Sequence, residues 1–243
     1  SLQEQARTKH WCIDIVDPTI TFDAAAWVRH ATDAIADICS RGRVPIVVGG
    51  TGFYIRALLT GLHHIDDVDL SVRQAVREEL AQRGPQAMHV ELQRVDPETA
   101  KRISATDPQR IGRALEVYRS TGKPLSGHFQ QDRPNNSYEA LTVGLWPPRD
   151  VLYESINVRA GAMLDQGLVD EVRLLVEQGV SPDEGPLTAL GYRQVVQHLR
   201  NEISENRLHE AIATAHRQYA RRQLTWFRGI TTRENNLQHI DPT

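Results

Sequence analysis

The sequence predicts an α/β fold, in which a core built on a parallel sheet is interrupted by an inserted helical domain. Apolar runs at 44–48 and 140–145 have the length and composition of buried strands. Residues 12–16 also predict a strand, and residues 22–41 carry apolar side chains at helical spacing. The order strand, helix, strand over 12–48 therefore predicts a right-handed crossover unit, which is the building block of a parallel sheet.

A long helical region separates the first strands from the strand at 140–145. The tripeptide at 83–85, Arg-Gly-Pro, ends one of its helices. Asp96-Pro97 and Asp107-Pro108 each begin another, since Asp caps a helix and Pro is tolerated in its first turn. A chain of 243 residues suits one large or two small domains. We therefore expect a core made of residues 1–63 and 139–243, with a helical insertion domain at 64–138.

Composition excludes several classes of protein. With a net charge of -3 and an apolar content of 40%, the chain is not a basic nucleic-acid binder as a whole, so any RNA surface must be local. No apolar run has the length of a membrane span, and no signal peptide is visible. Cys12 and Cys39 lack metal-ligand spacing, and we expect both as buried thiols. These features predict a cytoplasmic protein with no membrane association. We also expect a monomer, although no feature of the sequence determines the oligomeric state.

The turn after the run at 44–48 is the first candidate site. Gly49, Gly50, Thr51 and Gly52 lead directly into a predicted helix. Such a turn offers backbone N–H groups and the positive end of a helix to an anion, and Thr51 adds a hydroxyl. The alternative is a plain strand-to-helix turn in which glycine only permits a tight backbone.

The second candidate is an arginine-rich helix at 208–228. Arg217, Arg221 and Arg228 fall at spacings of four and seven, so they share one face, and Arg222 borders it. On a mildly acidic protein this stripe suits contacts with a phosphate backbone. The alternative is a solvated face whose arginines pair with acids of the same protein.

Three smaller features admit both functional and structural interpretations. Arg110 and Arg113 lie at the start of one helix, where they bind an anion, or Arg110 ties down Asp107 or Glu116. The segment 189–193 combines a glycine, a tyrosine and an arginine that can stack on bases, or it is a packing glycine beside a core tyrosine. Arg159 reaches an anion or a structural acid.

Six ordered segments resemble the tRNA dimethylallyltransferases, also called tRNA isopentenyltransferases. The family patterns are HHLIDI…P, PILVGGTGLYLKALL, D…QRIxRALEVYxxTGxPLS, MLxxGLxxEV, AIGYRQ and RQYAKRQxTWFR. In this sequence they correspond to 10–18, 45–59, 107–126, 163–172, 189–194 and 217–228. No single segment is specific, but their order over most of the chain is.

The resemblance implies a core like that of the P-loop nucleotide kinases and the transfer of a dimethylallyl group from its diphosphate to N6 of adenosine 37 in the tRNA anticodon stem-loop. It implies Mg2+ at the diphosphate, Thr51 as the catalytic residue, and diphosphate ligands Gly49, Gly50 and Arg159. The implied tRNA-binding residues are Gln109, Arg110, Ile111, Gly112, Arg113, Thr188, Ala189, Leu190, Gly191, Tyr192, Arg193, Arg221, Arg222, Gln223, Leu224, Thr225, Trp226, Phe227 and Arg228.

The sequence departs from the family pattern in several places. His216 stands where the family often has Thr, and Arg221 stands where it has Lys. The family's phosphate loop GPTASGKS and its following SVDSxQxYR segment, which carries the expected general base, are absent, so we expect further sequence upstream. Two alternatives stay open, namely an adenylate isopentenyltransferase that uses free AMP or ATP and a non-catalytic RNA-binding protein.

Overall fold

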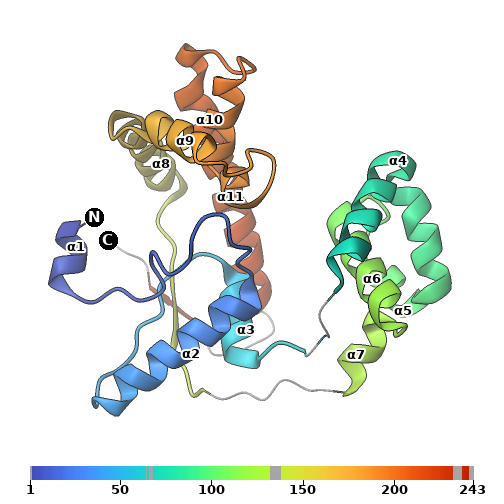
Figure 1. Cartoon of the computed structure of the whole chain (residues 1–243). Coiled ribbons are helices and arrows are strands. Elements are labelled where there is room, and N and C mark those ends of the chain that lie inside the picture. Colours follow the sequence, from blue (N-terminus) through green and yellow to red (C-terminus); the bar gives the residue numbers. More distant parts are fainter. Residues whose placement is uncertain (1, 64, 66–67, 132–137, 232–236, 241–243) are drawn as a thin grey trace. The chain divides into compact units, whose positions relative to one another are not determined.

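The computed structural model describes residues 2–63, 65, 68–131, 138–231 and 237–240. These residues form two compact units, each described by itself (Figure 1). Unit 1 comprises residues 1–59 and 138–243, and unit 2 comprises residues 60–137, where the sequence predicts an insertion at 64–138. No helix of the described residues combines the length and the apolarity that crossing a membrane requires.

Unit 1 is mainly helical. Its elements are α1 (Leu2–Arg7), α2 (Ala24–Ser40), α3 (Gly52–Thr60), β1 (Thr142–Leu145), α8 (Arg149–Asp165), α9 (Leu168–Glu177), the 3-10 helix η1 (Gly185–Thr188), α10 (Tyr192–Leu199), α11 (Glu205–Thr231) and β2 (Leu237–Ile240). The strand predicted at 140–145 is confirmed as β1, which pairs in parallel with β2. The helix predicted at 22–41 is confirmed as α2, where the Asp23 carboxylate accepts from the Ala26 N–H at 2.8 Å.

The main core of unit 1 lies among α8, α9, α10 and α11, which Figure 1 draws in yellow to red. Its fully buried members include Val172 on α9, Val195 on α10 and Ile212 on α11. The helices α2 and α3 make a separate contact, in which the Trp27 and Tyr54 rings lie 5.4 Å apart. The long helix α11 therefore begins in the core and continues beyond it.

The predicted strands at 12–16 and 44–48 were wrong, because neither segment is a strand in the structure. Cys12 and Asp14 have φ angles of 60° and 53°, which extended backbone excludes. Val44 and Val48 are 84% and 90% exposed. Composition gives these residues strand propensity, but a strand also needs a neighbour that accepts its hydrogen bonds, and among the described residues only β1 and β2 pair. Cys39 is exposed as well, contrary to expectation.

Unit 2 consists of α4 (Leu70–Val95), α5 (Pro97–Arg102), α6 (Pro108–Thr121) and α7 (Leu125–Gln131). The two Asp-Pro signals are confirmed, since Asp96 caps α5 and Asp107 caps α6. The predicted break at 83–85 appears as a kink inside α4, where Gly84 has φ 76° and ψ 162°.

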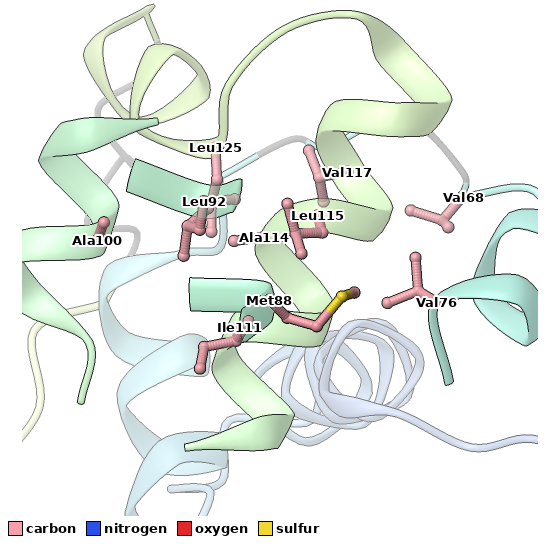
Figure 2. Close-up of a cluster of buried hydrophobic side chains, with 10 residues drawn as sticks. All are labelled: Val68, Val76, Met88, Leu92, Ala100, Ile111, Ala114, Leu115, Val117 and Leu125. Atoms are coloured by element: carbon pink, nitrogen blue, oxygen red, sulfur yellow. The ribbon is translucent and has the colours of Figure 1, made fainter. Parts of the chain in front are cut away.

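The core of unit 2 forms between the two halves of α4 and the helix α6 (Figure 2). Met88, Leu92, Ile111 and Leu115 are fully buried there. Asp96 is 1% exposed, and its carboxylate also accepts from the Ser126 N–H at 2.9 Å. Burial alone would raise the pKa of Asp96, but hydrogen bonds from residues 99 and 126 lower it. This carboxylate therefore ties the start of α7 to that of α5.

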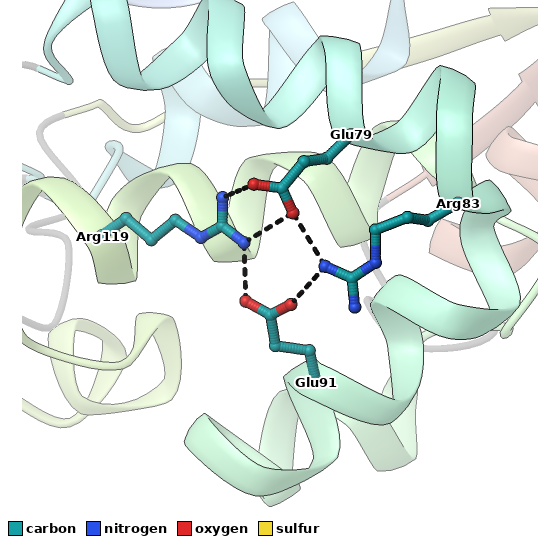
Figure 3. Close-up of polar contacts among 4 residues, drawn as sticks. All are labelled: Glu79, Arg83, Glu91 and Arg119. Carbon is teal, nitrogen blue, oxygen red and sulfur yellow. Dashed lines mark hydrogen bonds and ion pairs between the residues drawn. The ribbon is translucent and has the colours of Figure 1, made fainter.

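Four charged side chains form a closed ring across the kink in α4 (Figure 3). Arg119 of α6 donates to Glu79 at 2.8 and 3.1 Å and to Glu91 at 2.7 Å. Arg83 donates to the same two carboxylates at 2.8 and 3.1 Å. The hydrogen bonds from Arg119 lower the pKa of Glu79. Glu79 precedes the kink and Glu91 follows it, so the ring fixes the angle between the two halves of α4.

We predict that Arg119→Met lowers the free energy of unfolding of unit 2 by about 1–2 kcal/mol, because it opens a partly buried network of charges. Arg102→Met is the matched control, since Arg102 is 66% exposed and makes a single pair with Glu98 at 3.5 Å. Hydrogen exchange of the amides of α4 and α6, measured in the whole chain, reports the difference. Equal protection in the two variants would show that the ring does not hold the kink.

Candidate functional site

The glycine turn stands directly before α3. The Gly52 N–H donates to the Gly50 carbonyl at 3.1 Å, and the Tyr54 and Ile55 N–H groups donate to the Thr51 carbonyl at 2.9 and 3.2 Å. Thr51 is exposed, and it directly precedes the first residue of the helix. The first N–H groups of a helix have no partner within it, so this end of α3 presents positive partial charge beside the Thr51 hydroxyl.

One face of α11 packs against this turn, and we call it the inner face. It consists of Tyr219, Gln223 and Trp226, which fall at helical spacings of four and seven. The Gln223 side-chain amide donates to the Gly50 carbonyl at 3.1 Å. The Thr51 hydroxyl lies 3.4 Å from the Tyr219 hydroxyl. A segment distant in the sequence thus supports both the backbone and the hydroxyl of the turn.

Two of the glycines in the turn lie directly against α11, and the rigid Trp226 ring makes Gly52 the more constrained of the two. A Cβ atom at Gly50 would collide with the Gln223 amide, and one at Gly52 would collide with the Trp226 indole. A Cβ at Gly49 would meet nothing within 4 Å. Gly50 and Gly52 are therefore explained by the close approach of α11, whereas protein packing does not explain Gly49.

Aromatic contacts complete the surroundings of the inner face. The Arg56 guanidinium of α3 lies 5.7 Å from the Trp226 ring, and the Arg222 guanidinium lies 5.8 Å from the Tyr219 ring. Phe227 meets Trp146, directly after β1, edge to face at 6.4 Å. The Trp226 indole N–H is buried without a hydrogen-bond partner among the described residues. An unpaired buried donor is costly, so Trp226 is held here by packing.

The opposite, outer face of α11 is exposed. Arg221, Thr225 and Arg228 lie on it, while Arg222 is exposed at the border with the inner face and Leu224 is half-buried. Arg221 donates to the Tyr153 hydroxyl of α8 at 2.8 Å, and Arg149 lies 5.0 Å from the same ring. The hydrogen bond from Arg221 lowers the pKa of Tyr153. The outer face therefore gathers cations at the surface of the helix.

Arg217 and Arg159 differ in exposure and in the contacts that they make. The Arg217 side chain is 19% exposed and is bound to Asn157, Glu210 and Thr214. The structural interpretation of this arginine is thus the correct one. Arg159 lies exposed on α8, available to an anion.

The cluster at 109–113 lies in unit 2, at the start of α6. Ile111 is fully buried, and Gly112 is packed where a Cβ would lie 2.9 Å from Leu80. Gln109, Arg110 and Arg113 are exposed, although Arg110 lies 3.4 Å from the Asp107 carboxylate. Of these five residues, three therefore present side chains to the solvent, and two hold α6 against α4.

The segment 188–193 joins η1 to α10 beside the core of unit 1. Thr188, Ala189 and Arg193 are exposed and Leu190 is half-buried. Gly191 has φ +89°, and a Cβ there would meet Met163 at 3.2 Å. The Tyr192 hydroxyl donates to Glu171 at 2.6 Å, and burial together with this carboxylate raises the pKa of Tyr192 to about 12. This tyrosine is a packed, neutral hydrogen-bond donor.

The described residues contain no group of three or more His, Cys, Asp or Glu side chains that could hold a metal ion. Mg2+ often binds through substrate phosphates and water, with one or two carboxylates from the protein. The described residues therefore form no metal cage of their own.

Sequence reasoning missed the inner face. It treated α11 as an arginine stripe and assigned Gln223 and Trp226 to tRNA, and it did not single out Tyr219 or Arg56. The spacing of Tyr219, Gln223 and Trp226 was a visible signal for a second face, but the partner of that face lies in a distant segment.

Comparison with known proteins identifies the family. A sequence model described as IPP transferase matches residues 1–230. The chain is 44% identical to the tRNA dimethylallyltransferase of Syntrophobacter fumaroxidans, covering 93% of this chain and 66% of that protein. It is 42% identical to the tRNA dimethylallyltransferase of Salinibacter ruber, in an alignment that covers 94% of this chain and 70% of that protein. This chain thus spans about two thirds of the length of these relatives.

Solved structures give the same result. The full-length tRNA isopentenylpyrophosphate transferase of Bacillus halodurans aligns with a TM-score of 0.66 and 32% identity, covering 99% of this chain and 74% of that one. A eukaryotic dimethylallyltransferase, whose structures are described as snapshots of the enzyme acting on tRNA, aligns with a TM-score of 0.78 and 25% identity, covering 99% and 62%.

We predict that Gly52→Ala destabilises unit 1 by about 1–3 kcal/mol, because its Cβ displaces the rigid Trp226 indole. Gly49→Ala is the control, with an expected change within about 0.5 kcal/mol, since nothing lies near its Cβ. Denaturant unfolding of both variants measures the difference. Equal stability would contradict the close packing of α11 on the turn.

Proposed function

Because this chain belongs to the IPP transferase family, we propose that the full-length protein transfers the dimethylallyl group of dimethylallyl diphosphate to N6 of adenosine 37 in the tRNA anticodon loop. The relatives that carry the name tRNA dimethylallyltransferase support the reaction and the tRNA substrate. The likeness to solved tRNA isopentenyltransferases supports a core related to the nucleotide kinases. We also propose that the protein acts in the cytoplasm and as a monomer.

The observation that best supports the proposal is that two faces of α11 have different surroundings. Its inner face holds the glycine turn through Gln223 and Trp226, while its outer face presents Arg221, Arg222 and Arg228 at the surface. A prenyl transfer to tRNA needs an anion site for the diphosphate and a cationic surface for the nucleic acid backbone. One helix that borders both suits an enzyme that must bring these substrates together.

The proposed reaction is an alkyl transfer. The bond from the allylic carbon to the diphosphate oxygen breaks, a bond to the adenine N6 forms, and N6 loses a proton. Diphosphate leaves readily when its charge is neutralised, so we assign to the turn, to the Thr51 hydroxyl and to Arg159 the stabilisation of that charge. Mg2+ fits this chemistry as a partner of the diphosphate oxygens. Adenine must leave the stacked loop to reach the turn.

The tRNA contacts that we propose are the exposed members of three segments. They are Arg221, Arg222, Thr225 and Arg228 on α11, Thr188, Ala189 and Arg193 before and at the start of α10, and Gln109, Arg110 and Arg113 on α6. The first two sets lie in unit 1 and the third lies in unit 2. The arginines among them suit phosphate oxygens.

The reaction itself is tested by incubating the full-length protein with dimethylallyl diphosphate and either tRNA or AMP, followed by mass analysis of the nucleosides. We expect the modified adenosine in tRNA, and tRNA should outcompete AMP. Modification of AMP alone would favour an adenylate isopentenyltransferase, and modification of neither substrate would favour a non-catalytic RNA-binding protein.

We predict that Thr51→Ala lowers kcat by about 100-fold to 1,000-fold, as does the loss of one donor to a developing negative charge in other enzymes. The affinity for tRNA should stay within about twofold. Thr51→Ser retains the hydroxyl and should keep most of the turnover. An unchanged kcat in Thr51→Ala, accompanied by weaker tRNA binding, would move Thr51 out of the diphosphate site.

We also predict that Arg221→Ala and Arg222→Ala each weaken tRNA binding and make its dependence on salt shallower, by about one unit of slope for each phosphate that the variant no longer neutralises. Arg207→Ala is the control, because Arg207 is exposed in the first turn of the same helix. Titrations with an anticodon stem-loop at several salt concentrations provide the slopes. If both variants keep the slope of the wild type, the outer face of α11 does not contact the RNA backbone.

A further inference from the structure

We infer that Gln223 is a positioning residue for the diphosphate turn, and that it acts through the peptide bond between Gly50 and Thr51 without touching tRNA. This inference rests on the proposed function, because it assigns the turn to the diphosphate. It changes the role that the family resemblance implied for Gln223.

The contacts of Gln223 place it inside the protein. Its amide nitrogen donates to the Gly50 carbonyl at 3.1 Å and occupies the space where a side chain at position 50 would lie. Gln223 is half-buried, while its neighbours Arg221 and Arg222 are exposed. One donor of the Gln223 amide is therefore engaged with the turn.

Peptide geometry gives this hydrogen bond a consequence. The Gly50 carbonyl and the Thr51 N–H belong to one planar trans peptide, so they point in opposite directions. Gln223 draws the carbonyl toward α11, which directs the Thr51 N–H away from that helix. The Gly52 N–H donates to the same carbonyl at 3.1 Å and reinforces this orientation.

The orientation matters for binding an anion. A carbonyl oxygen turned toward a diphosphate would repel it, whereas an N–H turned toward it donates a charge-assisted hydrogen bond. Gln223 holds the Gly50 oxygen on the side of α11, and this leaves the Thr51 N–H for the ligand. Gln223 thus acts before any diphosphate binds, as preorganisation of the site.

Gln223→Met tests the inference, because methionine has a similar length and lacks the donor. We expect the KM for dimethylallyl diphosphate to rise about fivefold to tenfold, as for the loss of one hydrogen bond, while the KM for tRNA stays within about twofold. Gln218→Met is the matched control, since Gln218 lies on the same helix and is exposed. It should leave both constants unchanged. A KM for tRNA that rises while that for dimethylallyl diphosphate does not would overturn the inference.

A second measurement does not depend on activity. Hydrogen exchange of the amides of residues 49–52 should accelerate in Gln223→Met and not in Gln218→Met, because only the former frees the turn. If the wild type transfers no dimethylallyl group, the proposed function fails, and the exchange rates still decide whether Gln223 positions the turn. Unchanged exchange in Gln223→Met would overturn the positioning role whatever the activity.

Discussion

The contact between the inner face of α11 and the glycine turn is the constraint on which the candidate site depends. Gln223 and Trp226 fill the volumes that side chains at positions 50 and 52 would need. A helix can approach a backbone this closely only where the backbone carries no Cβ. Gly52 is thus required by packing against the Trp226 ring, and Gly50 lies against the end of the Gln223 side chain.

This contact also explains how α11 can serve two purposes. In a helix, side chains three or four residues apart lie on the same face, and the side chains between them lie on other faces. Residues 219, 223 and 226 are drawn toward the turn, while residues 221, 222, 225 and 228 remain in the solvent. The outer arginines are exposed, and Arg221 is bound to the Tyr153 hydroxyl of α8, so these side chains do not disturb the packing of the inner face.

Local signals in the sequence predicted local structure well. The caps at the Asp-Pro pairs 96–97 and 107–108 form where the sequence indicates, because each depends on residues nearby in the chain. The strand at 142–145 also forms where it was predicted, although its partner β2 lies far along the chain. The strands predicted at 12–16 and 44–48 do not form. A strand needs a pairing partner, and the composition of a segment does not identify one. The turn at 49–52 was identified as a candidate site, but its support by Tyr219, Gln223 and Trp226 lies in a contact between distant segments. In unit 2, the sequence likewise did not distinguish exposed from buried positions, because the segment 109–113 assigned to tRNA includes both the exposed Arg110 and the buried Ile111.

The meeting of Gly52 and Trp226 has a consequence for how this protein can change over generations. A larger residue at position 52 fits only if position 226 has first become smaller, and a smaller residue at 226 leaves a void until position 52 grows. Either order passes through a less stable intermediate. The two positions therefore change together or stay as they are, although 173 residues separate them in the chain.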